Sequence, residues 1–259
     1  MLDELHYDDL ASQRDLMDAV LLEKRVGCVV RGVVHPAACA VALGIVEGMA
    51  AKAPRRELCA GAHTLGILLA PTMSEPHGPD LSAYLAAAAS FRAEGALPPQ
   101  QWERVECALR TLADERPLVC PTSKDGRRYA SATLRVFQPG AEAAAHNDTY
   151  NDLACHRELD TMRDRRGQWS WYLPLSIPES GGALLVYTLK QGQVAAADPE
   201  RAVQDLTAAR YQIGVGDLVV FDGGRHVHSV ERCDGKTPRR TLGGFASLSA
   251  DHTSLLVWS

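Results

Sequence analysis

Two short histidine motifs in the second half of the chain have the composition of a metal site. His146 and Asp148 are separated by one residue, and His226 and His228 have the same spacing further along the chain. In an extended segment, residues i and i+2 point to the same face, so His146 and Asp148 can reach one ion together. Two imidazoles and one carboxylate hold a divalent metal on one face and leave its opposite face open to other molecules.

The third ligand of such a site must come from the second motif. His226 and His228 follow the turn signal Asp222-Gly223-Gly224, which comes directly after an apolar, β-branched run. Since these two histidines are also i and i+2, strand alternation alone does not choose between them. An H-x-D motif by itself often occurs by chance, so the prediction of a metal site depends on the rest of the pattern.

Arginine residues after the second motif predict a binding site for an acid. A guanidinium group forms two parallel hydrogen bonds with a carboxylate. Arg239 and Arg240 are both candidates for this role, and Thr241 adds a hydroxyl group beside them. An open metal face near an anchored acid is the arrangement expected of a non-haem Fe(II) oxygenase, and this is the chemistry that the residues predict.

The composition of the 259 residues excludes several classes of protein. The formal net charge of −5 provides no basic surface for nucleic acid or for a membrane. Charged residues interrupt every apolar stretch before it reaches the ~20 residues of a membrane span. Seven cysteines without a C-x-x-C pair are typical of reduced thiols, and the acidic start of the chain is unlike a signal peptide. We therefore expect a cytoplasmic protein with neither nucleic-acid nor membrane partners.

The elements that must position these residues fall into two parts of one predicted domain, 1–259. Residues 1–115 are predicted to form a mainly helical layer, apart from a β-branched run at 26–34. The dipeptide His35-Pro36 places proline in a favourable first-turn position of one helix. Helices are predicted at 8–23, 35–53, 81–93 and 98–112.

From about residue 129 onwards, short β-rich runs alternate with turn residues, which is typical of a sandwich or barrel. Two polar or alanine-rich segments, 156–168 and 190–210, interrupt this pattern, and we expect loops or short helices there, over a barrel mouth. Strands are predicted at 129–137, 169–177, 183–189, 212–213, 218–221, 226–231, 240–247 and 255–258.

The order of the motifs resembles that of the Fe(II)/2-oxoglutarate-dependent oxygenases, and most of all their prolyl-4-hydroxylase-like branch. The resemblance covers about residues 129–248 and implies an α+β fold, in which N-terminal helices pack on a double-stranded β-helix, or jelly-roll. Its motifs are Phe137-Gln138-Pro139-Gly140, His146-Asn147-Asp148, Gly181-Gly182-Ala183-Leu184, His228-Ser229-Val230 and Arg239-Arg240-Thr241.

This resemblance implies a role for each residue of the motifs. His146 and Asp148 match the first two iron ligands, and His228 matches the third because the family has H-x-V there. Arg239 matches the residue that binds the distal carboxylate of 2-oxoglutarate, with Thr241 as its hydroxyl partner. Arg240 is the competing choice, since Pro238 can shift the register. The pair Gly181-Gly182 matches a structural turn between strands.

The implied cofactors are Fe(II), 2-oxoglutarate and O2, with ascorbate supporting activity in vitro. The implied reaction couples decarboxylation of 2-oxoglutarate, to succinate and CO2, with hydroxylation of an unactivated C–H bond. Halogenases of the wider family have Gly or Ala in place of the carboxylate, so Asp148 favours hydroxylation, while desaturation or cyclisation needs the same ligands. The layout resembles that of small bacterial amino-acid hydroxylases related to free-amino-acid halogenases. The expected substrate is therefore a small molecule, a free or lightly modified amino acid.

Several alternatives stay open at this stage. The chain could be a non-catalytic jelly-roll binding module, or a cupin-like metalloenzyme without 2-oxoglutarate in which Arg239 lies on the surface. Arg135 alternates with Phe137 and points either into the barrel or outward to a salt bridge. His226 is either a pocket group or an ordinary strand-end residue. Two readings also apply to Trp258 (pocket or core) and to Asn147, Thr149, Tyr150 and Asn151 (pocket or solvated loop). Alternation between core and surface is expected for Trp169, Trp171 and Tyr172.

Overall fold

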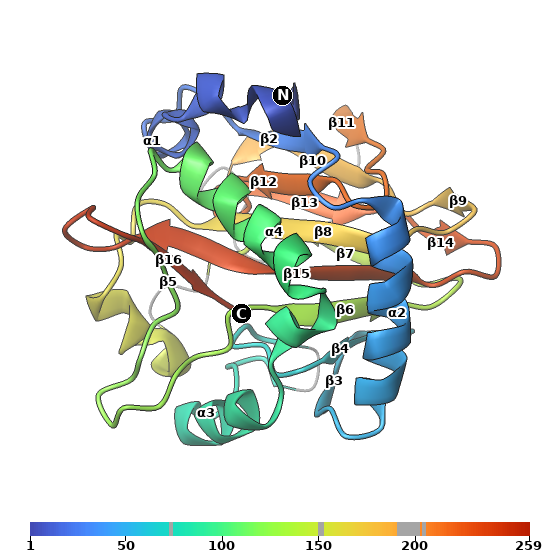
Figure 1. Ribbon diagram of the computed structural model, residues 1–259, viewed down its shortest axis with the longest axis horizontal. Coiled ribbons are helices and arrows are strands. Elements are labelled where there is room, and N and C mark those ends of the chain that lie inside the picture. The colour runs from blue at the N-terminus through green and yellow to red at the C-terminus, as the bar shows by residue number, and fades with distance from the viewer. Residues whose placement is uncertain (73–74, 150–152, 191–202, 204–205) are drawn as a thin grey trace.

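The computed structural model describes residues 1–72, 75–149, 153–190, 203 and 206–259. Two β-sheets face each other, and helices α2 and α4 lie across the outer face of the larger sheet (Figure 1). This arrangement confirms the predicted α+β jelly-roll with helices packed on it. His146, Asp148, His228 and Arg239 of the motifs line a cavity between the two sheets.

The larger sheet is mostly antiparallel and has ten strands. Its main path runs β1-β2-β12-β8-β15-β6-β4-β3, while β16 and β5 are attached beside β15. Strands β8 and β15 are the longest and occupy its centre. The bounds are β1 Asp3–His6, β2 Gly27–Arg31, β3 Arg55–Cys59, β4 Ala62–Leu65, β5 Leu118–Val119, β6 Thr133–Phe137, β8 Trp169–Ser176, β12 Leu218–Phe221, β15 Arg239–Leu248 and β16 Leu255–Trp258.

The smaller sheet has the strand order β11-β10-β13-β7. Its bounds are β7 Ala143–His146, β10 Leu184–Lys190, β11 Ala208–Tyr211 and β13 His226–Val230. A separate two-stranded ribbon pairs β9, Ser180–Gly181, with β14, Cys233–Asp234. Gly181 has a φ of +70°, and a Cβ atom there would collide with the carbonyl oxygen of Arg232, so the predicted glycine turn requires a residue without a side chain.

Four α-helices support the larger sheet: α1 Leu16–Leu21, α2 Pro36–Ala50, α3 Leu81–Ser90 and α4 Pro99–Leu112. Helix α2 begins with proline at its first turn, as predicted, and the His35 side chain caps it by accepting a hydrogen bond from the Ala37 N–H at 3.2 Å. Short 3₁₀ helices lie at Tyr7–Gln13, Ala93–Ala96, Ala154–His156 and Leu159–Thr161.

The central strand β8 is buried along its whole length. Trp169 and Trp171 point into the main apolar core beneath α2 and α4, and Tyr172 points the other way, into the space between the sheets. The predicted alternation between core and surface was therefore wrong for this strand, because its second face is covered by the smaller sheet rather than by water. Trp258 belongs to the core and packs against Phe245 at 6.1 Å between ring centroids.

Several other elements differ from the sequence prediction. Strands β1, β3, β4 and β7 were not predicted; β7 consists of three alanines and a histidine, which have little intrinsic β preference, and it is a strand because it pairs with β13. The helix predicted at 8–23 is a 3₁₀ turn followed by the short α1. Segment 156–168 contains short 3₁₀ turns, as expected, whereas 191–202 and 204–205 of the second interrupting segment lie outside the described residues.

All seven cysteines are free thiols, which agrees with the sequence prediction. Four of them are buried, and Cys59 lines the cavity between the sheets. Across the described part of the chain, no helix has both the length and the apolar character that a membrane crossing needs.

Candidate active site

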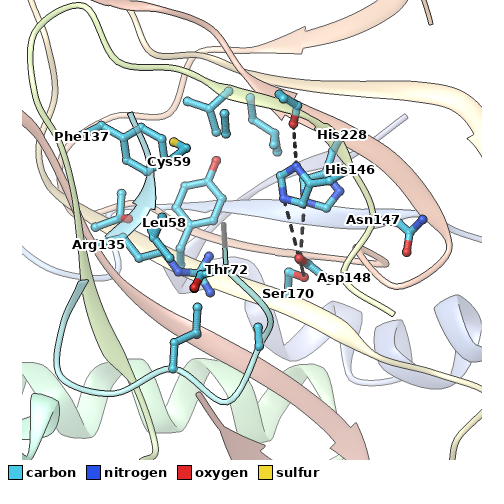
Figure 2. Close-up of a pocket in the computed structure, with 18 of the residues that line it drawn as sticks. Leu58, Cys59, Thr72, Arg135, Phe137, His146, Asn147, Asp148, Ser170 and His228 are labelled. Atoms are coloured by element: carbon cyan, nitrogen blue, oxygen red, sulfur yellow. Dashed lines mark hydrogen bonds and ion pairs between the residues drawn. The ribbon is translucent and has the colours of Figure 1, made fainter. Parts of the chain in front are cut away.

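Three residues of the predicted metal site lie together between the sheets. His146, Asp148 and His228 each offer a ligand atom, and these atoms lie within 4.8 Å of one another. The Nε2 atom of His146 is 3.7 Å from Oδ1 of Asp148, and Nε2 of His228 is 3.4 Å from Oδ2 (Figure 2). The pairing of β7 with β13 brings the histidines together, because His146 and His228 are direct partners in the ladder.

Both histidines are oriented so that Nε2 faces the cluster. Nδ1 of His146 lies 2.7 Å from the carbonyl oxygen of Ala144, and Nδ1 of His228 lies 3.0 Å from that of His226. Since a carbonyl only accepts, each Nδ1 donates its proton there, and Nε2 is the ring nitrogen left to face a metal. Phe221 packs its ring edge-on to His228 at 4.9 Å between centroids. The donor set and its orientation fit a divalent iron with open positions.

Asp148 is held from both its main chain and its carboxylate, and it is only 4 % exposed. Its N–H donates to the carbonyl of Gly223 at 2.7 Å, and the Ser170 hydroxyl donates to Oδ2. The amide of Gln168 donates to the Asp148 carbonyl. A Cβ atom on Gly223 would collide with Oγ of Ser170 and approach Oδ2 of Asp148 to 2.9 Å, so this turn must be glycine for the carboxylate to keep its place.

The local electrostatics favour the protonation states that bind a cation. Burial acts to raise the pKa of Asp148, but the neighbouring His228, His146 and Arg135 outweigh it, and the net pKa is lowered. Burial and the charge of His228 lower the pKa of His146 to about 4. At neutral pH Asp148 is therefore a carboxylate and His146 is a neutral imidazole, and these are the forms that coordinate a metal.

His226, the alternative third ligand, lies elsewhere. Its Nδ1 is 3.4 Å from the carbonyl oxygen of Tyr187, and its side chain lines a separate cavity of about 210 Å³ with Asp222 and Arg225. Alternation along β13 sends His226 and His228 to the same side, but His228 is the residue paired with His146 of β7, whereas His226 is paired with Lys190 of β10. The structure thus brings His228 and not His226 to the cluster.

A cavity of about 530 Å³ opens beside the three residues. Arg239 and Thr241 line it and are 4 % and 1 % exposed, which is the location that the sequence predicted for a co-substrate anchor. The Arg239 guanidinium lies over the rings of Tyr172, at 5.1 Å, and Phe137, at 5.7 Å. Arg240 does not line this cavity, and its Nη1 lies 3.4 Å from Oγ of Ser176. Pro238 therefore does not move the inward position from Arg239 to Arg240.

The structure adds two cavity residues to which the sequence analysis gave no role in the site. Ser170 orients Asp148, and Tyr172 lies beside Arg239 with its hydroxyl oxygen buried. Burial raises the pKa of Tyr172, so this hydroxyl keeps its proton and can donate to an acid. Both residues lie on the inner face of β8, and a correct assignment of that face would have found them by their alternation with Trp169 and Trp171.

The open questions about the other residues are resolved for those that the structure describes. Arg135 points inward and lines the cavity, as does Asn147, whose Oδ1 accepts a hydrogen bond from the Thr149 N–H at 3.2 Å. Thr149 instead donates its hydroxyl to the carbonyl of Gly224, which stabilises the turn. Tyr150 and Asn151 lie outside the described residues.

Comparison with solved structures shows the same fold at low sequence identity. An N-substituted L-amino acid dioxygenase from Burkholderia ambifaria AMMD, in complex with α-ketoglutarate, is 14 % identical, with 97 % of this chain and 92 % of that chain covered and a TM-score of 0.56. The α-ketoglutarate-dependent epimerase SnoN from nogalamycin biosynthesis is 13 % identical, with 93 % and 82 % covered and a TM-score of 0.50. A prolyl hydroxylase from Trichoplax adhaerens is 12 % identical, with 91 % and 90 % covered and a TM-score of 0.50.

The family comparison covers almost the whole chain. No curated protein matches the sequence. The family described as carrier-protein-independent halogenase WelO5 matches residues 2–259. With a histidine–aspartate–histidine cluster beside a cavity that contains a buried arginine, the chain has the parts that such an enzyme needs. The chain belongs to this family, and it is a 2-oxoglutarate-dependent non-haem iron oxygenase that uses Fe(II), 2-oxoglutarate and O2.

Proposed function

We propose that the protein hydroxylates an unactivated C–H bond of a small molecule, a free or lightly modified amino acid, and releases succinate and CO2. The observation that carries this proposal is the carboxylate of Asp148, which is oriented toward both histidines at the wall of a cavity of about 530 Å³. That volume is within the range of small-molecule sites, roughly 300–1,000 Å³. The free thiols are consistent with a cytoplasmic enzyme.

Each part of the cavity has a role in this reaction. His146, Asp148 and His228 hold Fe(II), which supplies the oxidising power for hydrogen removal once O2 is present. Arg239 binds the distal carboxylate of 2-oxoglutarate through its guanidinium fork, and the hydroxyls of Tyr172 and Thr241 lie on the same inner face to donate to that acid. Apolar side chains from both sheets, from residues 58–71 and from Pro76 surround the remaining space and exclude water from the reacting carbon.

Halogenation is the second candidate because of the description of the family that matches the chain. A halide needs its own position on the metal. In this protein the Asp148 carboxylate would take that position, and the Ser170 hydroxyl and the main chain of Gly223 hold it in place. Hydroxylation is therefore the reaction that this site supports best.

The dioxygenase similar in structure is described as acting on N-substituted L-amino acids, which supports an amino acid as the substrate here. The test uses purified protein with Fe(II), 2-oxoglutarate, ascorbate and a panel of free and N-acylated amino acids, with chloride present. We expect succinate formation that depends on one class of substrate, and a product heavier by one oxygen atom. Asp148→Ala serves as the inactive control.

Other outcomes would favour the other functions. A chlorinated product would show that the native enzyme is a halogenase. Oxygen consumption without succinate would indicate a metalloenzyme that does not use 2-oxoglutarate. Ligand binding with neither succinate nor oxygen consumption would indicate a binding module.

A further inference from the structure

A second arginine of the cavity, Arg135, helps to lower the pKa of Asp148 but has no binding partner in the site described so far. It lies on β6 two residues from Phe137, and both side chains line the cavity. Figure 2 shows Arg135 reaching into the pocket apart from the metal-binding cluster. Its guanidinium carbon lies 5.5 Å from the centroid of the Phe245 ring, and its buried Nε has no hydrogen-bond partner within the described chain.

The lack of a partner distinguishes Arg135 from arginines buried for structural reasons. Arg56 is paired with Glu75, and Arg163 is paired with Asp160. Among the described residues, no carboxylate forms an ion pair with Arg135 or with Arg239, the other arginine of this cavity. A guanidinium that is buried, even in part, without an anion is energetically unfavourable. Two such groups facing one cavity therefore indicate two anionic groups in its occupants.

The two arginines serve different parts of the cavity. Along β15, Arg239 is paired with Phe137 and Thr241 is paired with Arg135, so the two guanidiniums start from diagonal positions of neighbouring strands. The two side chains extend to different rings: the Arg239 guanidinium lies over Phe137 and Tyr172, whereas the Arg135 guanidinium lies over Phe245.

The contact with Phe245 places the Arg135 guanidinium beside the part of β15 that lies next to the metal-binding cluster. Phe245 is paired with Ser170 in the ladder between β15 and β8, and Ser170 donates its hydroxyl to Asp148. Arg239 is the first residue of β15 and comes six residues before Phe245, so it lies at the far end of the strand from Phe245. In the proposed function, 2-oxoglutarate would use one carboxylate at the metal and the other at Arg239, so neither would be left for Arg135. Arg135 remains for the substrate.

We propose that Arg135 binds the carboxylate of the amino-acid substrate and so positions its side chain toward the metal; this inference rests on the proposed function. The chemical class that fits is a small acid with a free carboxylate next to an apolar body. Leu58, Leu68, Pro71 and Pro76 line the same cavity and provide the apolar surface for that body. An amide or an internal peptide residue lacks the group that Arg135 recognises.

The test compares acids with their amides in the variants Arg135→Met and Arg135→Lys. The protein is loaded with Mn(II) and 2-oxoglutarate, a combination in which the substrate binds but no reaction takes place. It is titrated calorimetrically with L-leucine, N-acetyl-L-leucine and the two matching primary amides. We expect Arg135→Met to weaken binding of the preferred acid about 10- to 100-fold, the size expected for loss of a charge-assisted pair. Binding of the amide should change little, and Arg135→Lys should restore part of the loss for the acid.

Arg240→Met is the matched control, because it removes the same group from a side chain outside the cavity. It should leave acid and amide binding unchanged. The affinity for 2-oxoglutarate, measured on Mn(II)-loaded protein without substrate, should stay within about twofold of the wild type in Arg135→Met.

Three results would overturn the inference. A fall in 2-oxoglutarate affinity in Arg135→Met would assign Arg135 to the co-substrate. Equal loss of acid and amide binding would show a structural role. A wild-type protein that binds amides as well as acids would show that no carboxylate is recognised. Failure of the proposed function is a separate result, because acid-selective binding without any oxygenated product would contradict the reaction and leave the role of Arg135 intact.

Discussion

The two faces of the larger sheet contrast sharply, although the same strands form both. On the outer face, Trp169, Trp171 and Leu242 pack with α2 and α4 in the main apolar core. On the inner face, polar and charged groups line the cavity, and at Arg135 the guanidinium has no anionic partner among the described residues. The outer face thus stabilises the fold, and the inner face keeps its hydrogen-bonding groups for ligands.

Strand β15 shows the contrast within one segment. Leu242, Ala246 and Leu248 belong to the apolar core, whereas Arg239 and Thr241 line the cavity. Because successive residues of a strand point to opposite faces, one strand can serve both functions without a compromise at any position. We therefore expect substitutions on the outer face to change stability and those on the inner face to change binding and chemistry.

The largest effect is expected on the inner face, for His228→Ala. Removal of one ligand from a three-residue site should abolish Fe(II) binding and reduce succinate formation to the background. The melting temperature of the metal-free protein should change little, because the ring faces a cavity. Metal analysis, a succinate assay and circular dichroism test this. His226→Ala is the control, and loss of iron in that variant alone would mean that the third ligand is His226.

On the outer face, Trp171→Ala should cause the largest loss of stability. Trp171 is 1 % exposed and packs against Trp102 at 6.3 Å between ring centroids, so truncation leaves a cavity in the core. The expected loss is about 3–5 kcal/mol in the free energy of unfolding, measured by urea denaturation. Tyr172→Phe on the opposite face of β8 is the comparison, and it should change stability by less than about 1.5 kcal/mol. Similar losses in both variants would contradict the division between the faces.

Arg239→Lys should weaken binding of 2-oxoglutarate roughly 10- to 100-fold, because an ammonium group replaces a two-pronged donor with a single point of charge. The KM for 2-oxoglutarate and its affinity for the Mn(II)-loaded protein measure the effect. Arg240→Lys, one residue further and outside the cavity, should stay within about twofold of the wild type. A reversed result would show that Arg240 is the anchor.

The smallest effect is expected for Ser170→Ala, which removes the hydroxyl that donates to Asp148 and leaves the three ligands in place. Loss of such a supporting hydrogen bond typically lowers metal affinity about tenfold or somewhat more. Competition with a chelator measures the Fe(II) affinity. Ser176→Ala provides the matched change, since the Ser176 hydroxyl donates to the carbonyl of Pro238 away from the cluster. Equal affinities in the two variants would show that Ser170 does not orient Asp148.

The sequence by itself determined the type of fold and the segments that supply the cluster. Strands β12 and β16 begin and end where their apolar runs predicted, because dense β-branched and aromatic runs between turn residues are local signals. The spacing of His146 and Asp148 is also a local signal, because residues i and i+2 of an extended segment point to the same face. The resemblance in the order of motifs led to the family that the comparison then showed.

The tertiary structure alone decided which faces of the strands meet. Strand alternation allows His226 and His228 equally, and the pairing of His228 with His146 between β13 and β7 brings only His228 to the cluster. The same holds for Arg239 against Arg240 and for the inward direction of Arg135, since period two defines two faces but does not say which is the cavity. Ser170 became part of the site only because β8 is covered on both sides, and this covering depends on segments that are distant in sequence.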